Sequence, residues 1–282
     1  MVYLFLIVFV CLACPVVPFV VKNLYLIVFY GILDIYKYFR FKRWREFRRY
    51  GKIMCYCGLF GAGKTLSMTH FVRSIYQQYN GVEVYDFESG QWVIQHLHII
   101  SNYALTDIPY TPLVCEQQLY NIEQPKQDVT IVLLDEISAI FNNRDYKNFT
   151  PDLLTSLLQC RHRKVMFLGT AQRFQMTDKN FRQTMETSSN CKKFWRICRV
   201  NLLDAYELEN CTNPLMLKPI ARQYWFVRDS DYEAYDTNEM VTKLVKTAQE
   251  GKLLTSSEIS TKQGETASNM SFATSVKKRF KK

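Results

Sequence analysis

The chain has 282 residues, of which 48% are hydrophobic, so it is long and apolar enough for a folded domain with appendages and is not disordered throughout. Its formal net charge of +10 is unevenly placed. Residues 37–52 carry eight basic residues and one acidic residue, a net +7, and residues 277–282 carry +5. The remainder sums to 10 − 12 = −2, which argues against a basic nucleic-acid-binding surface on the folded part.

Residues 1–35 are predicted to form a transmembrane anchor. Residues 2–21 contain no charged side chain, and residues 24–33 are again apolar. About 20 apolar residues suffice to cross a bilayer. No Lys or Arg precedes residue 22, which disfavours a secretory signal peptide. Two prolines, Pro15 and Pro18, leave open whether the chain crosses the membrane once or twice.

Residues 36–50 mix Tyr, Phe and Trp with Lys and Arg, as helices at a membrane surface do. A solvated basic linker is the alternative. Basic residues beside a membrane span stay on the cytoplasmic side. We therefore expect the chain beyond about residue 40 to be cytoplasmic and this segment to bind anionic lipids.

The segment "CYCGLFGAGKTLSMTHF" contains the phosphate-binding pattern G-x-x-x-x-G-K-T. A strand is predicted over 52–57 and a helix after the glycines, which is the context that this Walker A motif requires. Backbone N–H groups of such a loop point at phosphate oxygens. We expect ATP to bind here, with Lys64 at the terminal phosphates and the hydroxyl of Thr65 on Mg²⁺. The predicted nucleotide-binding residues are Gly58, Gly61, Ala62, Gly63, Lys64, Thr65 and Leu66.

The segment "VTIVLLDEISAIF" (129–141) predicts a second part of the same site, a Walker B motif. Its continuous apolar run is typical of a strand buried on both faces. Asp135 and Glu136 follow this strand, at the sheet edge where ligands bind in α/β folds. We expect Asp135 to hold Mg²⁺, directly or through water, and Glu136 to act as the general base. A surface acid pair is the alternative.

The remaining pattern predicts an α/β fold of the P-loop NTPase class, with a RecA-like, mostly parallel sheet and helices on both faces, preceded by the N-terminal transmembrane segment. The ATPase domain is expected over 51–235, and the polar segment 236–282, with its basic end, is expected to be disordered. Further strands are predicted over 82–87, 96–105, 165–172, 194–200 and 223–229, an extended turn over 108–113, and a helix over 151–164.

Gln172 ends the strand predicted over 165–172, where a polar side chain is able either to orient the attacking water or to sense the terminal phosphate. A simple surface position is the alternative. Arginines also gather in this region, and in ring ATPases a neighbour's arginine neutralises charge in the transition state. The candidates are Arg161, Arg163, Arg173 and Arg182, of which we favour Arg161 or Arg163. For any single one, a solvated cation at a helix end is the alternative.

The nine cysteines are an odd number without disulfide-framework spacing, which favours reduced, cytosolic thiols. One of Cys55 and Cys57 is expected to be a small core residue.

Together with "GLFGAGKT" and "IVLLDEISAIFNNR", the stretches "ISNYAL…IPY" and "LLQCRHRKVMFLGTAQR" make residues 51–190 resemble the zonula occludens toxin (Zot) domain family, which includes filamentous-phage assembly ATPases. The resemblance implies a RecA-type ATPase core in an inner-membrane protein of a bacterial host. It also implies that Lys64, Thr65, Asp135, Glu136 and Gln172 hold the family's site positions. In filamentous-phage members the ATPase precedes the membrane span, whereas here the span comes first.

We therefore expect a membrane-anchored ATPase, assembled as a homo-oligomeric ring, that drives extrusion of a filamentous-type phage or transport of its single-stranded DNA. The cargo is the coat protein or the DNA. A packaging or conjugative DNA pump is the alternative with the same chemistry. A membrane scaffold that is switched by nucleotide without hydrolysis is the non-enzymatic alternative.

Overall fold

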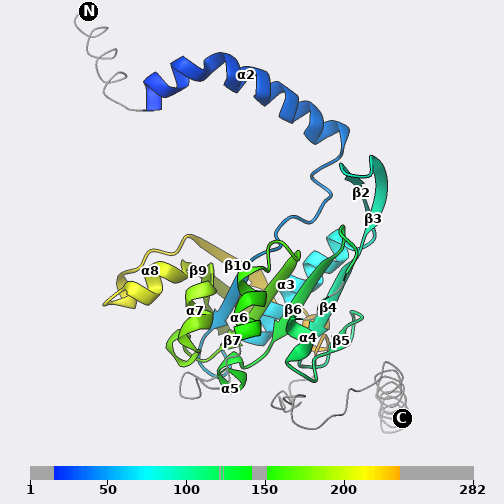
Figure 1. The fold of residues 1–282 in the computed structure, drawn as a ribbon. Helices are drawn as coiled ribbons and strands as arrows, with labels where there is room; N and C mark the ends of the chain where they lie inside the picture. The colour runs from blue at the N-terminus through cyan, green and yellow to red at the C-terminus, as the bar shows by residue number, and fades with distance from the viewer. Residues whose placement is uncertain (1–15, 121, 123, 142–150, 236–282) are drawn as a thin grey trace, which may run out of the picture.

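An eight-stranded sheet forms the centre of the fold in the computed structural model, which describes residues 16–120, 122, 124–141 and 151–235 (Figure 1). The strand order is β10-β9-β8-β1-β7-β6-β4-β5. Neighbours from β8 to β5 run parallel, while β8–β9 and β9–β10 are antiparallel. The predicted mostly parallel sheet is therefore confirmed. The strands are β1 (Ile53–Cys57), β4 (Leu97–Ser101), β5 (Thr111–Pro112), β6 (Val129–Leu134), β7 (Val165–Ala171), β8 (Thr187–Phe194), β9 (Ile197–Asp204) and β10 (Ala221–Phe226).

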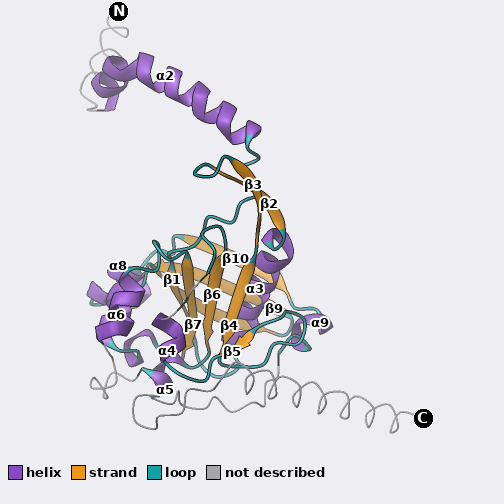
Figure 2. Ribbon diagram, turned by 45° about the vertical axis from the view of Figure 1, so that its right-hand side comes forward, coloured by secondary structure: helices purple, strands orange, loops and turns teal. Residues whose placement is uncertain are grey.

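Helices cover both faces of this sheet. The central strands β1, β6 and β7 are therefore buried at every residue, and their alternate side chains enter opposite layers. One layer is built on α3 (Lys64–Tyr79), whose Met68, Val72 and Ile75 pack with strand residues such as Met54. The other layer (Figure 2) contains α4 (Gln117–Tyr120), α5 (Ile137–Ile140), α6 (Pro151–Leu158), α7 (Lys179–Thr184) and α8 (Ala205–Asn210). Short helical turns lie at η2 (Phe174–Met176), η3 (Pro214–Met216) and α9 (Asp229–Tyr232).

Three details of the sequence prediction were wrong. The strand predicted over 194–200 instead straddles the turn of the β8–β9 hairpin, where Trp195 has a φ of 53°. The segment 96–105 contains only the short β4, and a separate hairpin of β2 (Val82–Asp86) and β3 (Gln91–Gln95) precedes it. The helix predicted to reach residue 164 ends at Leu158.

Cys55 and Cys57 are both buried in the same layer of the core. The expectation that only one of them would be a core residue was wrong, because residues two apart on a strand share a face.

The N-terminal part that the structure describes begins with α2 (Val16–Arg40), in which no residue is buried. Among the described residues it is the one helix long and apolar enough to cross a membrane. The number of crossings depends partly on residues 1–15, and the predicted tail is 236–282; both lie outside the described residues.

Different elements lie at the two ends of the parallel strands (Figures 1 and 2). The amino ends of the strands lie toward α2 and the β2–β3 hairpin. The carboxyl ends lead into the glycine-rich loop after β1 and into α5 after β6. The predicted nucleotide site and the predicted membrane segment are thus at opposite ends of the domain.

Candidate nucleotide-binding site

The glycine-rich loop connects β1 directly to the first turn of α3. Gly61 and Gly63 have φ values of 74° and 75°, a conformation that glycine adopts without the strain that a Cβ brings. A Cβ on Gly58 would lie 2.9 Å from the carbonyl oxygen of Cys191 and 3.0 Å from the Cβ of Ala62. The loop is therefore held close to β8, at the N-terminus of a 16-residue helix, where anions bind favourably.

The three residues after the glycines point in different directions. Lys64 is 8% exposed, and its Nζ lies 3.4 Å from the carbonyl oxygen of Leu59 within the loop. Thr65 donates a hydrogen bond from its Oγ1 to the Oδ1 of Asp135 at 2.8 Å. The side chain of Leu66 is 2% exposed and packs in the core, so only its backbone faces the loop.

The Thr65–Asp135 contact joins the two predicted motifs, which are 70 residues apart in sequence. Asp135 is held in place from two further sides. The side-chain amide of Asn102 accepts from the backbone N–H of Asp135 at 2.7 Å and donates to its carbonyl oxygen at 3.0 Å. The hydroxyl of Thr170 donates to the Oδ1 of Asp135 at 2.5 Å. These contacts fix both the backbone and the carboxylate of Asp135.

Glu136 adopts the left-handed conformation, with φ 53° and ψ 53°. For a residue with a Cβ this costs on the order of 1–3 kcal/mol and persists only where surrounding contacts hold it. Its backbone N–H donates to the Oγ1 of Thr170 at 2.9 Å. The next residue, Ile137, lies directly over Gly169 of β7, where a Cβ would be 1.7 Å from the Cδ1 of Ile137. The strained turn therefore depends on Thr170 and on the missing side chain at Gly169.

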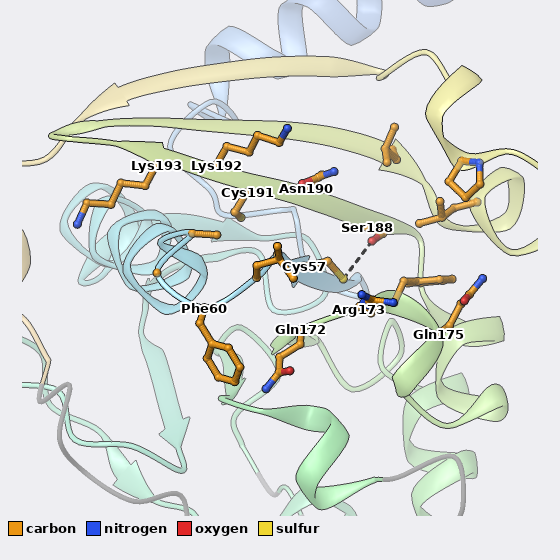
Figure 3. Close-up of a pocket in the computed structure, with 18 residues that line it drawn as sticks. Cys57, Phe60, Gln172, Arg173, Gln175, Ser188, Asn190, Cys191, Lys192 and Lys193 are labelled. Atoms are coloured by element: carbon orange, nitrogen blue, oxygen red, sulfur yellow. Dashed lines mark hydrogen bonds between the residues drawn. The ribbon is translucent and has the colours of Figure 1, made fainter.

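A cavity of about 660 Å³ opens beside the loop and is lined by residues from β1, the glycine-rich loop, β8 and the segment after β7 (Figure 3). Gln172 and Arg173 lie in its wall, opposite Asn190 and Lys192 of β8. Gln172 follows β7 directly, as the sequence predicted for the end of this strand, and its role in catalysis stays a prediction.

The thiols of Cys57 and Cys191 line this cavity. The Sγ atoms of Cys55 and Cys57 are 3.6 Å apart. This contact lowers the pKa of Cys57, and together with burial it raises the pKa of Cys55. Burial raises the pKa of Cys191 to about 12. Cys57 is therefore the more acidic thiol of this cavity.

The predicted arginines do not gather at the site of their own chain. Arg161 and Arg163 precede β7, at the amino edge of the sheet, whereas the loop and Asp135 are at the carboxyl edge. Any role for them in a neighbouring subunit's site stays a prediction. Arg182 forms an ion pair with Glu209 at 3.1 Å. Of the four candidates, Arg173 is the one that lines the cavity.

Sequence reasoning missed Asn102 and Thr170 as site residues. Asn102 lies in "ISNYAL" and Thr170 in "GTAQ", two stretches that carry the resemblance to the Zot family. The signal was present as polar residues at or just beyond the carboxyl ends of β4 and β7, the edge where ligands bind.

Residues 54–192 match the family model described as "ATPase family associated with various cellular activities (AAA)". This match covers the loop, Asp135, Glu136 and Gln172. The chain contains a P-loop NTPase domain. The comparison with curated proteins returned no match.

Solved structures similar to the P-loop NTPase domain include the N-terminal domain of zonular occludens toxin from Neisseria meningitidis. The identity is 15% and the TM-score 0.45, over 66% of this chain and 99% of that one. A second is the genome packaging NTPase from Sulfolobus turreted icosahedral virus 2 in complex with ATP-gammaS. The identity is 12% and the TM-score 0.37, over 63% and 93% of the two chains.

The residues at the site fit ATP and Mg²⁺. The space around Gly61 is open, since a Cβ there would meet nothing within 4 Å. Lys64 already turns its ammonium group into the loop. Thr65 and Asp135 present two oxygen atoms to each other, and Mg²⁺ in nucleotide sites takes few protein ligands, because phosphate and water supply the others. Among the described residues, no group of three or more His, Cys, Asp or Glu side chains offers a separate metal site.

Proposed function

We propose that the chain is a membrane-anchored ATPase that uses ATP hydrolysis to drive extrusion of a filamentous-type phage, or transport of its single-stranded DNA, across the inner membrane of a bacterial host. The observation that best supports hydrolysis is the hydrogen bond from Thr65 to Asp135 at 2.8 Å, with Glu136 next in the chain. The membrane anchor in this proposal is α2. The assignment of the cargo rests on the resemblance to the Zot family.

The residues divide the chemistry between them. Lys64 and the loop amides bind the phosphates of ATP, and Thr65 and Asp135 hold the Mg²⁺ that offsets their charge. Glu136 takes a proton from the attacking water, while Gln172 in the cavity wall orients that water. A scaffold that only binds nucleotide would not need a general base beside Asp135.

The proposal is tested by ATP hydrolysis of the full chain in lipid nanodiscs, with and without single-stranded DNA. Glu136→Gln should still bind ATP but lose hydrolysis by about 10²-fold or more, as expected when a general base is removed. Lys64→Ala should lose binding as well. Stimulation of the wild type by DNA would identify DNA as the cargo, whereas hydrolysis that is indifferent to DNA would favour coat protein.

Two results would contradict the proposal. Wild-type protein that binds ATP and never hydrolyses it, with or without DNA, would favour the nucleotide-switched scaffold. Stimulation by double-stranded DNA in preference to single-stranded DNA would favour a packaging pump.

A further inference from the structure

The β2–β3 hairpin exposes an unusual amount of apolar surface. Phe87 at its turn is 53% exposed, and Trp92 and Ile94 on β3 are 42% and 50% exposed. The hairpin forms a two-stranded sheet of its own, apart from the eight-stranded sheet. A two-stranded ribbon is marginally stable in water, and consecutive large apolar side chains on it favour aggregation unless something covers them.

The chain that leaves α2 packs its aromatic and basic side chains on the outer part of this hairpin. The ring of Phe41 stacks on Tyr85 with 4.3 Å between centroids and contacts Phe87 at 5.0 Å. The guanidinium of Arg43 lies 5.3 Å from the centre of the Phe87 ring. The Nζ of Lys42 lies 5.9 Å from the centre of the Trp92 ring. Exposed aromatic rings thus sit among cations immediately after the candidate membrane helix.

The hairpin also lies at the level where α2 would leave a membrane. The last turn of α2 carries Lys37 and Arg40, and the contacts with the hairpin begin at the next residue, Phe41. Figures 1 and 2 show the hairpin beside this end of α2, between α2 and the body of the domain. Trp and Tyr are enriched at this depth of membrane proteins, because their rings suit the headgroup region.

Charge near the hairpin is also suited to anionic lipid. A second cavity, of about 550 Å³, is lined by Lys126, His162, Arg163 and Lys164 together with Glu88 from the hairpin turn. The acids at the turn are already paired. Glu88 forms an ion pair with Lys126 at 2.6 Å, and the Asp86 carboxylate accepts backbone N–H bonds from Glu88 and Ser89.

We infer that the β2–β3 hairpin is a second membrane contact, which inserts Phe87, Trp92 and Ile94 among the headgroups of an anionic bilayer beside α2. The inference rests on the membrane anchorage in the proposed function. The cations after α2, together with Arg163 and Lys164 at the second cavity, bind the lipid phosphates, and the aromatic side chains enter the interface. The hairpin then fixes the domain against the membrane, with the nucleotide site on the far side.

The test uses the full chain reconstituted in phosphatidylcholine vesicles that contain phosphatidylglycerol and lipids brominated near the headgroup end of the acyl chains. Bromine quenches the emission of a tryptophan at that depth. The chain has four tryptophans. Trp44 packs against Tyr38 and Phe39 at the end of α2, so Trp44 and Trp92 are the two tryptophans placed at the interface. Trp92→Phe should therefore remove about half of the quenchable emission. Trp195→Phe is the matched control, since Trp195 is 69% exposed at the β8–β9 turn, beyond the carboxyl edge.

Extraction with alkaline carbonate separates the possible failures. If the chain resists extraction and Trp92→Phe leaves the quenchable emission unchanged, the hairpin contact is refuted while the anchor stands. If carbonate releases the chain, the anchorage is refuted and the inference with it. Resistance to extraction, loss of quenching in Trp92→Phe and no loss in Trp195→Phe would support the contact.

Discussion

Gly169 is the position where one added carbon should disturb the site most directly. A Cβ there would lie 1.7 Å from the Cδ1 and 2.5 Å from the Cγ1 of Ile137, far inside contact distance. Ile137 is fully buried in the core and follows the strained Glu136, so it has little room to move. Overpacking of this kind costs about 1–3 kcal/mol in the free energy of unfolding. For a domain of this size, each kcal/mol lowers the melting temperature by about 2–4 °C.

The melting temperature of Gly169→Ala in detergent, followed by tryptophan fluorescence, measures this cost. The matched variant is Ile137→Ala, which removes both clashing atoms, Cδ1 and Cγ1, and by itself costs about 2–5 kcal/mol. If the clash with Ile137 is the cause, the double variant should be more stable than the sum of the two losses predicts, by about 0.5 kcal/mol or more. Strictly additive losses would refute the assignment of the cost to this contact. Hydrolysis should fall in Gly169→Ala as well, because a displaced Ile137 moves Glu136.

Three further changes probe the polar contacts of the same turn. Thr170→Val leaves the N–H of Glu136 without its acceptor and removes one of the two hydroxyl donors to Asp135, and should cost about 1–3 kcal/mol in stability by thermal unfolding, whereas Thr170→Ser should keep both bonds. Asn102→Ala removes both bonds to the backbone of Asp135, and should raise the Mg²⁺ concentration needed for half-maximal hydrolysis; an unchanged Mg²⁺ titration would contradict this. Gln172→Ala should leave the affinity for a fluorescent ATP analogue unchanged while hydrolysis falls, and a loss of affinity instead would assign Gln172 to nucleotide binding.

The core of the fold was predictable because its signals are local. β1, β6 and β7 are buried on both faces and therefore read as continuous apolar runs, and the glycine-rich loop has a fixed spacing of residue types. The β8–β9 hairpin gave no such signal. Its turn is occupied by Trp195, although a positive φ ordinarily favours Gly or Asn, so the sequence "FWRICRV" looks like one continuous strand.

Asn102 shows why part of the site was not predictable. Its role consists of two hydrogen bonds to the backbone of Asp135, 33 residues away, and these depend on β4 and β6 being neighbours in the sheet. The strand predicted over 96–105 placed Asn102 inside a strand, so its position just beyond the carboxyl end of β4 was hidden until the strand's true end was known. The distance of Arg161 and Arg163 from the site follows from the direction of β7. Both arginines precede the amino end of this strand, whereas the site lies at its carboxyl end.

Strand direction also relates the nucleotide site to the membrane. α3 begins at Lys64 in the site and ends at Tyr79, which at 1.5 Å per residue is a span of about 24 Å toward the amino edge. Its end is tied to the base of the β2–β3 hairpin, because Gly81 donates its backbone N–H to the carbonyl oxygen of Gln95 at 2.9 Å. The buried side chain of Gln95 in turn accepts from the backbone N–H of Phe47, in the segment that leads down from α2. α3 therefore connects the predicted nucleotide site directly to the elements that we propose lie nearest the membrane.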